Sequence, residues 1–287
     1  LDLLDTTELN GIVLDIKDYT GVVGYEPISS ELKLAATWEK RIPRINALIK
    51  TLHDHNVYVI GRIAMFQDSA LVKIRPDLAL LSSSTGAVWG DRKGVHWLDT
   101  ASQEVWDYNI AIAKDALARG FDEINFDYIR FASDGNISDI VYPFYDKTKL
   151  KSSVLRDFFA YLRAGLPDSK ISADLFGEVT YTDESGIGQR LKDAFPSFDY
   201  IAPMIYPSHY ANGFNGIAKP AEHPYDVVRY SMESAVAKLK TKNLELRTES
   251  SSSSVLSPKF SVSFRPWLQD FDLGADYTAE MVRAQIQ

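Results

Sequence analysis

Two acidic residues stand inside stretches that otherwise read as buried β-strands. Asp127 lies in the middle of EINFDYIRF (123–131), and Asp174 lies in the apolar run 170–177. A charge is expensive inside such a strand, so each carboxyl group needs a physical reason to be there. Two carboxyl groups on successive strands are suited to acid/base work on a glycosidic bond, one as the proton donor and the other as the nucleophile or base.

Other polar side chains share the strand face that these carboxyl groups occupy. Side chains alternate along a strand, so positions of equal parity lie on one face. Most strand-like segments then have one bulky apolar face and one face of small residues with a charge or a tyrosine. The polar positions are Asp15, Lys17, Arg62, Asn125, Asp127, Asp174, Tyr206 and Arg265. They fall toward the carboxyl ends of the strands, where active sites of parallel barrels lie, and their opposite charges can compensate one another.

Three further features bear on the same chemistry. Arg130 has the other parity, and it either turns back to brace Asp127 or lies on the rim of the site. Aromatic side chains suited to stacking on sugar rings are Trp89, Trp97, Tyr206 and Trp267. Two other interpretations stay open, namely purely structural ion pairs and a hard-cation site built from aspartate oxygens. A serine hydrolase is disfavoured, because the chain has no G-x-S-x-G elbow.

Strands that alternate with helices must position these residues. The strand-like segments are 11–18, 57–66, 123–131, 170–177, 199–206 and 260–269. Helical spacing of apolar residues between them indicates a parallel sheet, either open or closed into a barrel. No glycine-rich phosphate turn follows the first strand, which disfavours a dinucleotide site. We expect an α/β fold of the (β/α)8 TIM-barrel type, formed by 1–287 as one domain and lacking a strand at one or both ends.

The connections between these elements differ in character. The chain reads as helical at both ends, over 1–8 and 278–287. The segment 67–100 is a long loop, and loops of this length in compact domains are usually functional or disordered. The serine-rich stretch 248–258 is of low complexity and is expected to be a flexible loop before the last strand.

Composition excludes several classes of function. The net charge of −8 argues against nucleic acid as the main partner, because phosphate binding requires a basic face. No apolar run approaches the length of a membrane span. No basic-then-apolar signal segment begins at Leu1, so any targeting sequence is expected to have been removed. The chain has no cysteine, so it has neither disulfides nor a thiolate nucleophile. The aromatic content of 12% suits a large core or a surface that binds sugars.

The order of several motifs resembles a known family. They are ELNGIVLDIKD, VYVIGRIAMFQD, VHWLD, FDEINFDYIRFASDG, ISADLFGEVT, IGQ, YIAPMIYPSHY, HPYDVV and RPWLQDF. In this order they resemble the bacterial glycoside hydrolase family DUF4015, which is similar to the α-amylase type of barrel. The resemblance runs over nearly the whole chain and implies a TIM-barrel glycosidase without a cofactor.

The resemblance also implies roles for individual residues. Asp127 would be the nucleophile, as the aspartate of the fourth strand is in amylase-type barrels. The acid/base would be Asp174 of the SADxFG pattern or Glu178, which lies four residues later with the same parity. Tyr206 and His209 would line the sugar site. The RPWLQ motif places Arg265 to orient a carboxylate and Trp267 as a sugar platform or barrel plug, while Ala132 stands where the family commonly has proline.

We therefore expect a glycosidase that uses two carboxyl groups on an extracellular or cell-envelope polysaccharide. Its expected partner is a poly- or oligosaccharide, and no nucleic acid, membrane insertion, metal or cofactor is expected. A barrel that binds saccharides without turnover, and a metal-dependent hydrolase that uses the same aspartates, are the alternatives.

Overall fold

The structure is a computed structural model that describes residues 1–34, 37–183, 185–250 and 260–287. The helices are α1 Asp2–Thr6, α2 Ile45–Asp54, α3 Ser69–Ile74, α4 Gln103–Ala118, α5 Lys151–Gly165, α6 Leu191–Ala194, α7 Pro224–Ser250 and α8 Ala279–Ile286. The strands are β1 Gly11–Lys17, β2 Tyr58–Ala64, β3 Leu81–Ser82, β4 Glu123–Asp127, β5 Ile140–Val141, β6 Lys170–Phe176, β7 Tyr200–Ile205, β8 Ser263–Phe264 and β9 Trp267–Leu268. Helices separate most of the long strands along the chain, as the sequence pattern predicts.

The chain forms two compact units, which are described separately. The first consists of Leu1–Ser172 and Gly186–Gly188, and the second of Ala173–Ser185 and Gln189–Gln287.

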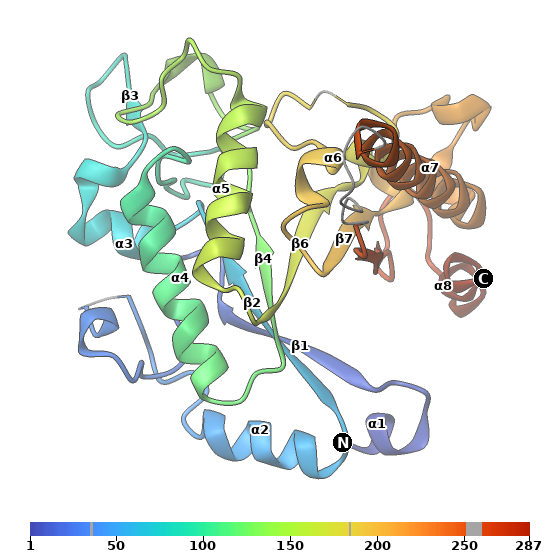
Figure 1. The fold of residues 1–287 in the computed structure, drawn as a ribbon, viewed down its shortest axis with the longest axis horizontal. Coiled ribbons are helices and arrows are strands. Elements are labelled where there is room, and N and C mark those ends of the chain that lie inside the picture. Colours follow the sequence, from blue (N-terminus) through green and yellow to red (C-terminus); the bar gives the residue numbers. More distant parts are fainter. Residues whose placement is uncertain (35–36, 184, 251–259) are drawn as a thin grey trace. The chain divides into compact units, whose positions relative to one another are not determined.

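Three parallel strands organise the first unit. β2 pairs in parallel with β1 on one side and with β4 on the other, and Figure 1 shows α4 running alongside these strands. The register places Asp15 beside Arg62, and Ala64 beside Asp127. The polar residues of the three strands are therefore held at neighbouring levels of one sheet.

Amphipathic helices cover these strands in the way their spacing predicts. In α5 the buried residues are Val154, Leu155, Phe158, Phe159 and Leu162, which recur at intervals of three and four.

The side chain of Asp68 caps α3 by accepting the Leu71 N–H at 2.7 Å, which satisfies one of the free amide groups at the helix start.

In the second unit, β7 is the neighbour of β6 and pairs in parallel with β8 and β9. Its buried core includes Ile205, Tyr210, Val227 and Val228. The long helix α7 packs against α8 and against the 3₁₀ turn Gly177–Thr180 that follows β6. This turn is kept close to β7 by glycine, because a Cβ on Gly177 would lie 2.6 Å from the carbonyl oxygen of Met204.

Several predicted boundaries were wrong. The strand predicted over 123–131 ends at Asp127, and the one predicted over 260–269 is reduced to β8 and β9, each of two residues. The loop predicted over 67–100 contains helix α3 and strand β3. Most of the serine-rich loop predicted over 248–258 lies outside the described residues, and its first three residues belong to α7.

Candidate functional site

A guanidinium group joins two of the predicted carboxylates in the first unit. Arg62 donates from Nη1 to Asp15 Oδ1 at 2.9 Å and from Nη2 to Asp127 Oδ2 in a short contact. Asp127 is only 4% exposed, whereas the side chain of Asp15 is half-exposed. The Arg62 charge thus compensates a carboxylate that is almost removed from water. The alternation of side chains predicted correctly that these three residues share one face.

The backbone beyond Asp127 adopts a conformation that is rare for its residue type. Tyr128 has φ +53°, in the left-handed region, and this ends the strand. Its N–H donates to Asp127 Oδ1 at 2.6 Å, so each carboxylate oxygen has a donor. Burial and the Asp127 charge raise the pKa of the Tyr128 phenol. Strained non-glycine residues of this kind cluster at functional sites.

Arg130 lies beside this carboxylate and is enclosed by aromatic rings. Its guanidinium carbon is 4.7 Å from the centre of the Trp97 ring and 5.7 Å from that of Tyr128. Arg130 Nη1 also donates to Ser133 Oγ at 2.8 Å. Burial lowers the pKa of Arg130, and the charge of Asp127 opposes that change.

The expectation that Trp97 stacks on a sugar is wrong. Its side chain is 0% exposed, and its indole N–H donates to Asp91 Oδ2 at 3.1 Å. Trp89 is likewise buried. Both tryptophans are core residues, and Trp97 supports the guanidinium of Arg130.

Lys17 is also not where alternation placed it. The register of β1 shifts between Asp15 and Lys17, so this residue no longer shares a face with Asp15. Its Nζ makes an ion pair of 2.8 Å with Asp68 and a hydrogen bond of 3.0 Å with Asn109 Oδ1, on α4. Lys17 is therefore a fully buried structural residue that has turned toward the helix layer. Gly21 makes room for its partner, because a Cβ there would lie 1.8 Å from Asp68 Oδ1.

Asn125 lies within the sheet of the first unit. It is buried, and its Nδ2 donates to Ser172 Oγ at 3.0 Å. This contact makes Asn125 a cross-strand linker in the level below Asp127. A role in substrate binding stays a prediction.

In the second unit the Trp267 indole donates a hydrogen bond to Asp174, one of the two candidate proton donors. Asp174 is buried, and its Oδ1 accepts the N–H of Trp267 at 2.7 Å. Trp267 is positioned by β9, where it pairs with Met204 of β7. The sequence showed Trp267 only as a platform or plug, and its bond to a carboxyl group was missed because the two residues are far apart in the chain.

Trp267→Phe is expected to lower the free energy of unfolding by about 1.5–3 kcal/mol, because it keeps an aromatic ring but removes a donor to a buried carboxyl group. Chemical denaturation measures the change. Trp106→Phe is the matched control, since the Trp106 N–H donates to the uncharged carbonyl of Thr100 at 2.9 Å. Its expected cost is about 0.5–1.5 kcal/mol. Equal losses in the two variants would contradict the assignment of Trp267 as the donor to the buried Asp174 carboxyl group.

The PSHY segment forms an aromatic corner after β7. Tyr206 lies 5.4 Å from His209 and 5.4 Å from Phe271, measured between ring centres. Burial lowers the pKa of His209, which favours the neutral imidazole at pH 7. Arg265 stacks on the ring of Tyr200 at 4.6 Å. Sugar binding by Tyr206, His209 and Arg265 stays a prediction.

Glu178 has a different environment from the two buried aspartates. It lies in the Gly177–Thr180 turn, is half-buried, and its carboxyl group makes no hydrogen bond or ion pair with the residues that the structure describes. Burial raises its pKa. A carboxyl group that keeps its proton more readily than usual is what a general acid requires.

The described ranges contain neither a metal-binding cluster nor a membrane-spanning helix. No group of three or more His, Asp or Glu side chains there is arranged to hold a metal ion. No helix in the same ranges is long and apolar enough to cross a bilayer.

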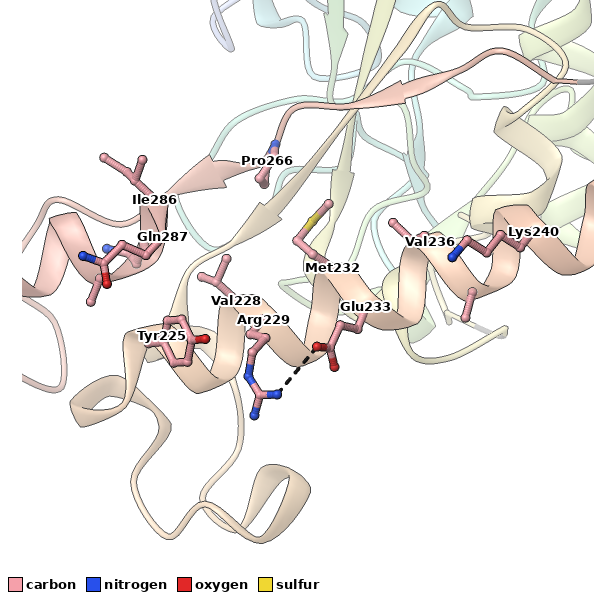
Figure 2. Close-up of a pocket in the computed structure, with 13 residues that line it drawn as sticks. Tyr225, Val228, Arg229, Met232, Glu233, Val236, Lys240, Pro266, Ile286 and Gln287 are labelled. Atoms are coloured by element: carbon pink, nitrogen blue, oxygen red, sulfur yellow. Dashed lines mark ion pairs between the residues drawn. The ribbon is translucent and has the colours of Figure 1, made fainter.

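A hollow of about 610 Å³ lies between α7 and α8. Figure 2 shows the residues that line it. Apolar side chains such as Met232 and Ile286 line it, next to the Arg229–Glu233 ion pair of 3.6 Å. None of the candidate carboxylates contributes to its lining.

Comparison with solved structures places this geometry in a known fold. A hypothetical protein from Ruminiclostridium thermocellum ATCC 27405 is 39% identical over 60% of this chain and 87% of its own, with a TM-score of 0.56. The α-galactosidase TtGalA from Thermus thermophilus, in complex with p-nitrophenyl α-D-galactopyranoside, is 15% identical over 99% of this chain, with a TM-score of 0.55. The same enzyme in complex with stachyose is 16% identical, with a TM-score of 0.55. The chain spans about half the length of this α-galactosidase, 50% and 52% in the two structures.

The α-galactosidase is a TIM-barrel glycosidase, which confirms the predicted fold class. No curated protein sequence matches the chain significantly. A family model described as "Putative glycosyl hydrolase domain" matches residues 1–287. Because this model covers the whole given sequence, the chain belongs to the family DUF4015.

Proposed function

We propose that this protein is a glycoside hydrolase that cleaves an extracellular or cell-envelope polysaccharide with two carboxyl groups. The observation that carries the proposal is the state of Asp127. It is buried at the end of β4, its two oxygens are held by Arg62 and by the Tyr128 N–H, and the adjoining backbone is strained. A structural ion pair requires no such strain.

In the proposed mechanism Asp127 is the nucleophile. Its carboxylate attacks the anomeric carbon, and the bond from that carbon to the glycosidic oxygen breaks. The electron pair stays on the leaving oxygen, which takes a proton from the second carboxyl group. Water deprotonated by that same group then releases the sugar, with net retention of configuration. The second carboxyl group is Asp174 or Glu178, and the surroundings of Glu178 suit a proton donor.

A screen of defined oligosaccharides, with products identified by mass, tests the proposal. The panel includes stachyose, which the Thermus α-galactosidase binds, together with fragments of cell-wall and capsular polysaccharides. We expect at least one member to be hydrolysed, and the rate to be unaffected by a chelator because the two carboxyl groups perform the chemistry. Binding of a sugar without any product would contradict hydrolysis and support the saccharide-binding alternative.

A further inference from the structure

The turn that carries Glu178 also presents an exposed aromatic ring. The N–H of Tyr181 donates to the carbonyl of Glu178 at 3.1 Å, which is the i to i+3 bond of a 3₁₀ helix. Side chains three residues apart in such a helix lie above one another on one face. The Glu178 charge contributes, after burial, to raising the pKa of Tyr181, as expected for neighbouring side chains. The carboxyl group and the ring therefore form one surface.

The Tyr181 ring packs against other aromatic rings and is partly exposed to solvent. Tyr181 is 38% exposed, yet its ring centre lies 4.8 Å from that of Phe214 and 5.8 Å from that of Tyr210. Phe214 comes from the loop after β7 and also packs on Tyr230, at 5.4 Å. A ring fixed at its edges with part of its surface in water is suited to the apolar face of a sugar.

A lysine of α7 fixes the backbone of the turn. Lys238 Nζ donates to the carbonyl of Thr182 at 2.7 Å and to that of Val179 at 3.2 Å. It also pairs with Asp183 at 2.8 Å. Val179 directly follows Glu178 and Thr182 directly follows Tyr181, so the backbone is fixed next to each of these two residues. Catalytic groups need this kind of support, because small displacements reduce their effect.

We propose that the face formed by Glu178 and Tyr181 is the subsite for the leaving sugar, with Tyr181 as its platform and Lys238 as a positioning residue. This rests on the proposed glycosidase function and assigns the proton donor within it. Glu178 gives its proton to the glycosidic oxygen as the bond to the anomeric carbon breaks, and the sugar that departs is the one stacked on Tyr181.

The test compares two substrates that share a glycone but differ in leaving group. One is the oligosaccharide from the screen that the wild type hydrolyses, and the other is the matching glycosyl fluoride, which has no leaving sugar and little need of a proton. We expect Glu178→Gln to lower kcat/KM for the oligosaccharide by about 10²–10⁴-fold and to leave the fluoride within about tenfold. Tyr181→Ala should raise KM for the oligosaccharide about tenfold and leave the fluoride unchanged.

Matched variants separate this subsite from general damage. Tyr181→Phe keeps the ring, so its KM for the oligosaccharide should rise far less than that of Tyr181→Ala. Tyr225→Ala removes an exposed tyrosine of α7 outside the turn and should change neither substrate. Glu178 sets the alkaline limb of the pH–rate profile. Lys238→Met should shift this limb, and Lys238→Arg should return it to its wild-type position.

The possible results distinguish an error in the proposed subsite from an error in the proposed glycosidase function. If Glu178→Gln or Tyr181→Ala affects both substrates equally, or neither, the subsite is wrong while the glycosidase function stands. If the wild type hydrolyses no sugar of the panel, the proposed function is wrong and the subsite with it.

Discussion

Asp127→Asn is expected to lower kcat on the oligosaccharide by about 10³-fold or more, because removing a nucleophile abolishes the covalent step that it performs. The amide has the same shape as the carboxylate, so the sugar should still bind. Steady-state kinetics measure the loss, and calorimetry of the oligosaccharide with the variant measures the retained affinity.

The chain offers a matched substitution for comparison. Asp146→Asn removes a carboxylate from an exposed turn of the same unit, where Asp146 accepts the N–H of Thr148 at 2.9 Å. It should leave kcat unchanged. An Asp127→Asn variant that is folded and retains wild-type kcat would remove Asp127 from the mechanism.

Lys17→Met should lower the free energy of unfolding by roughly 3–5 kcal/mol, the range for breaking a buried ion pair from one side. Lys17 and Asp68 both have side chains that are 0% exposed, at 2.8 Å from each other. The substitution leaves the Asp68 charge buried without its counter-charge. Urea denaturation measures the change.

Lys33→Met is the matched control. Lys33 pairs with Glu26 at 3.0 Å, but these side chains are 40% and 42% exposed, so the expected loss of stability is much smaller than for Lys17→Met. Similar costs for the two variants would contradict the buried position of Lys17.

The pH dependence of the stability loss in Lys17→Met is a second test of the ion pair between Lys17 and Asp68. Burial raises the pKa of Asp68, and the Lys17 charge opposes this rise. Without Lys17 the folded-state pKa of Asp68 is higher still. The contribution of Asp68 to the free energy of unfolding is then fully present below the pKa that Asp68 has in the unfolded chain. This contribution is lost as the pH rises through the folded-state pKa. The deficit of Lys17→Met should therefore shrink as the pH falls from 7 toward 4. A deficit that is constant over this range would contradict the account.

Strand alternation was enough to place three of the predicted polar residues of the first unit. It requires only that the backbone stays extended, and it correctly brought Asp15, Arg62 and Asp127 onto one face. It failed at Lys17, because a register shift of one residue reverses every later side chain. It also failed at Tyr128, whose left-handed backbone leaves no mark in the residue type.

The roles of the tryptophans could not be read from the chain for a related reason. Trp97 and Trp267 both looked like sugar platforms, yet each indole N–H binds an aspartate, Asp91 and Asp174 respectively. The second of these pairs joins residues 93 positions apart, and nothing local signals it. The spacing of Glu178 and Tyr181, in contrast, is local, and a 3₁₀ turn there was the missing information.

In the proposed mechanism Asp127 forms a covalent bond to the sugar, and this bond can be trapped. Wild-type protein would be incubated with an activated fluorosugar of the glycone that it hydrolyses, quenched, digested and examined by mass spectrometry. We expect one added glycosyl mass, located on Asp127 in the peptide that contains 123–131. An adduct on a different carboxyl group, or hydrolysis with inversion and no adduct, would contradict it.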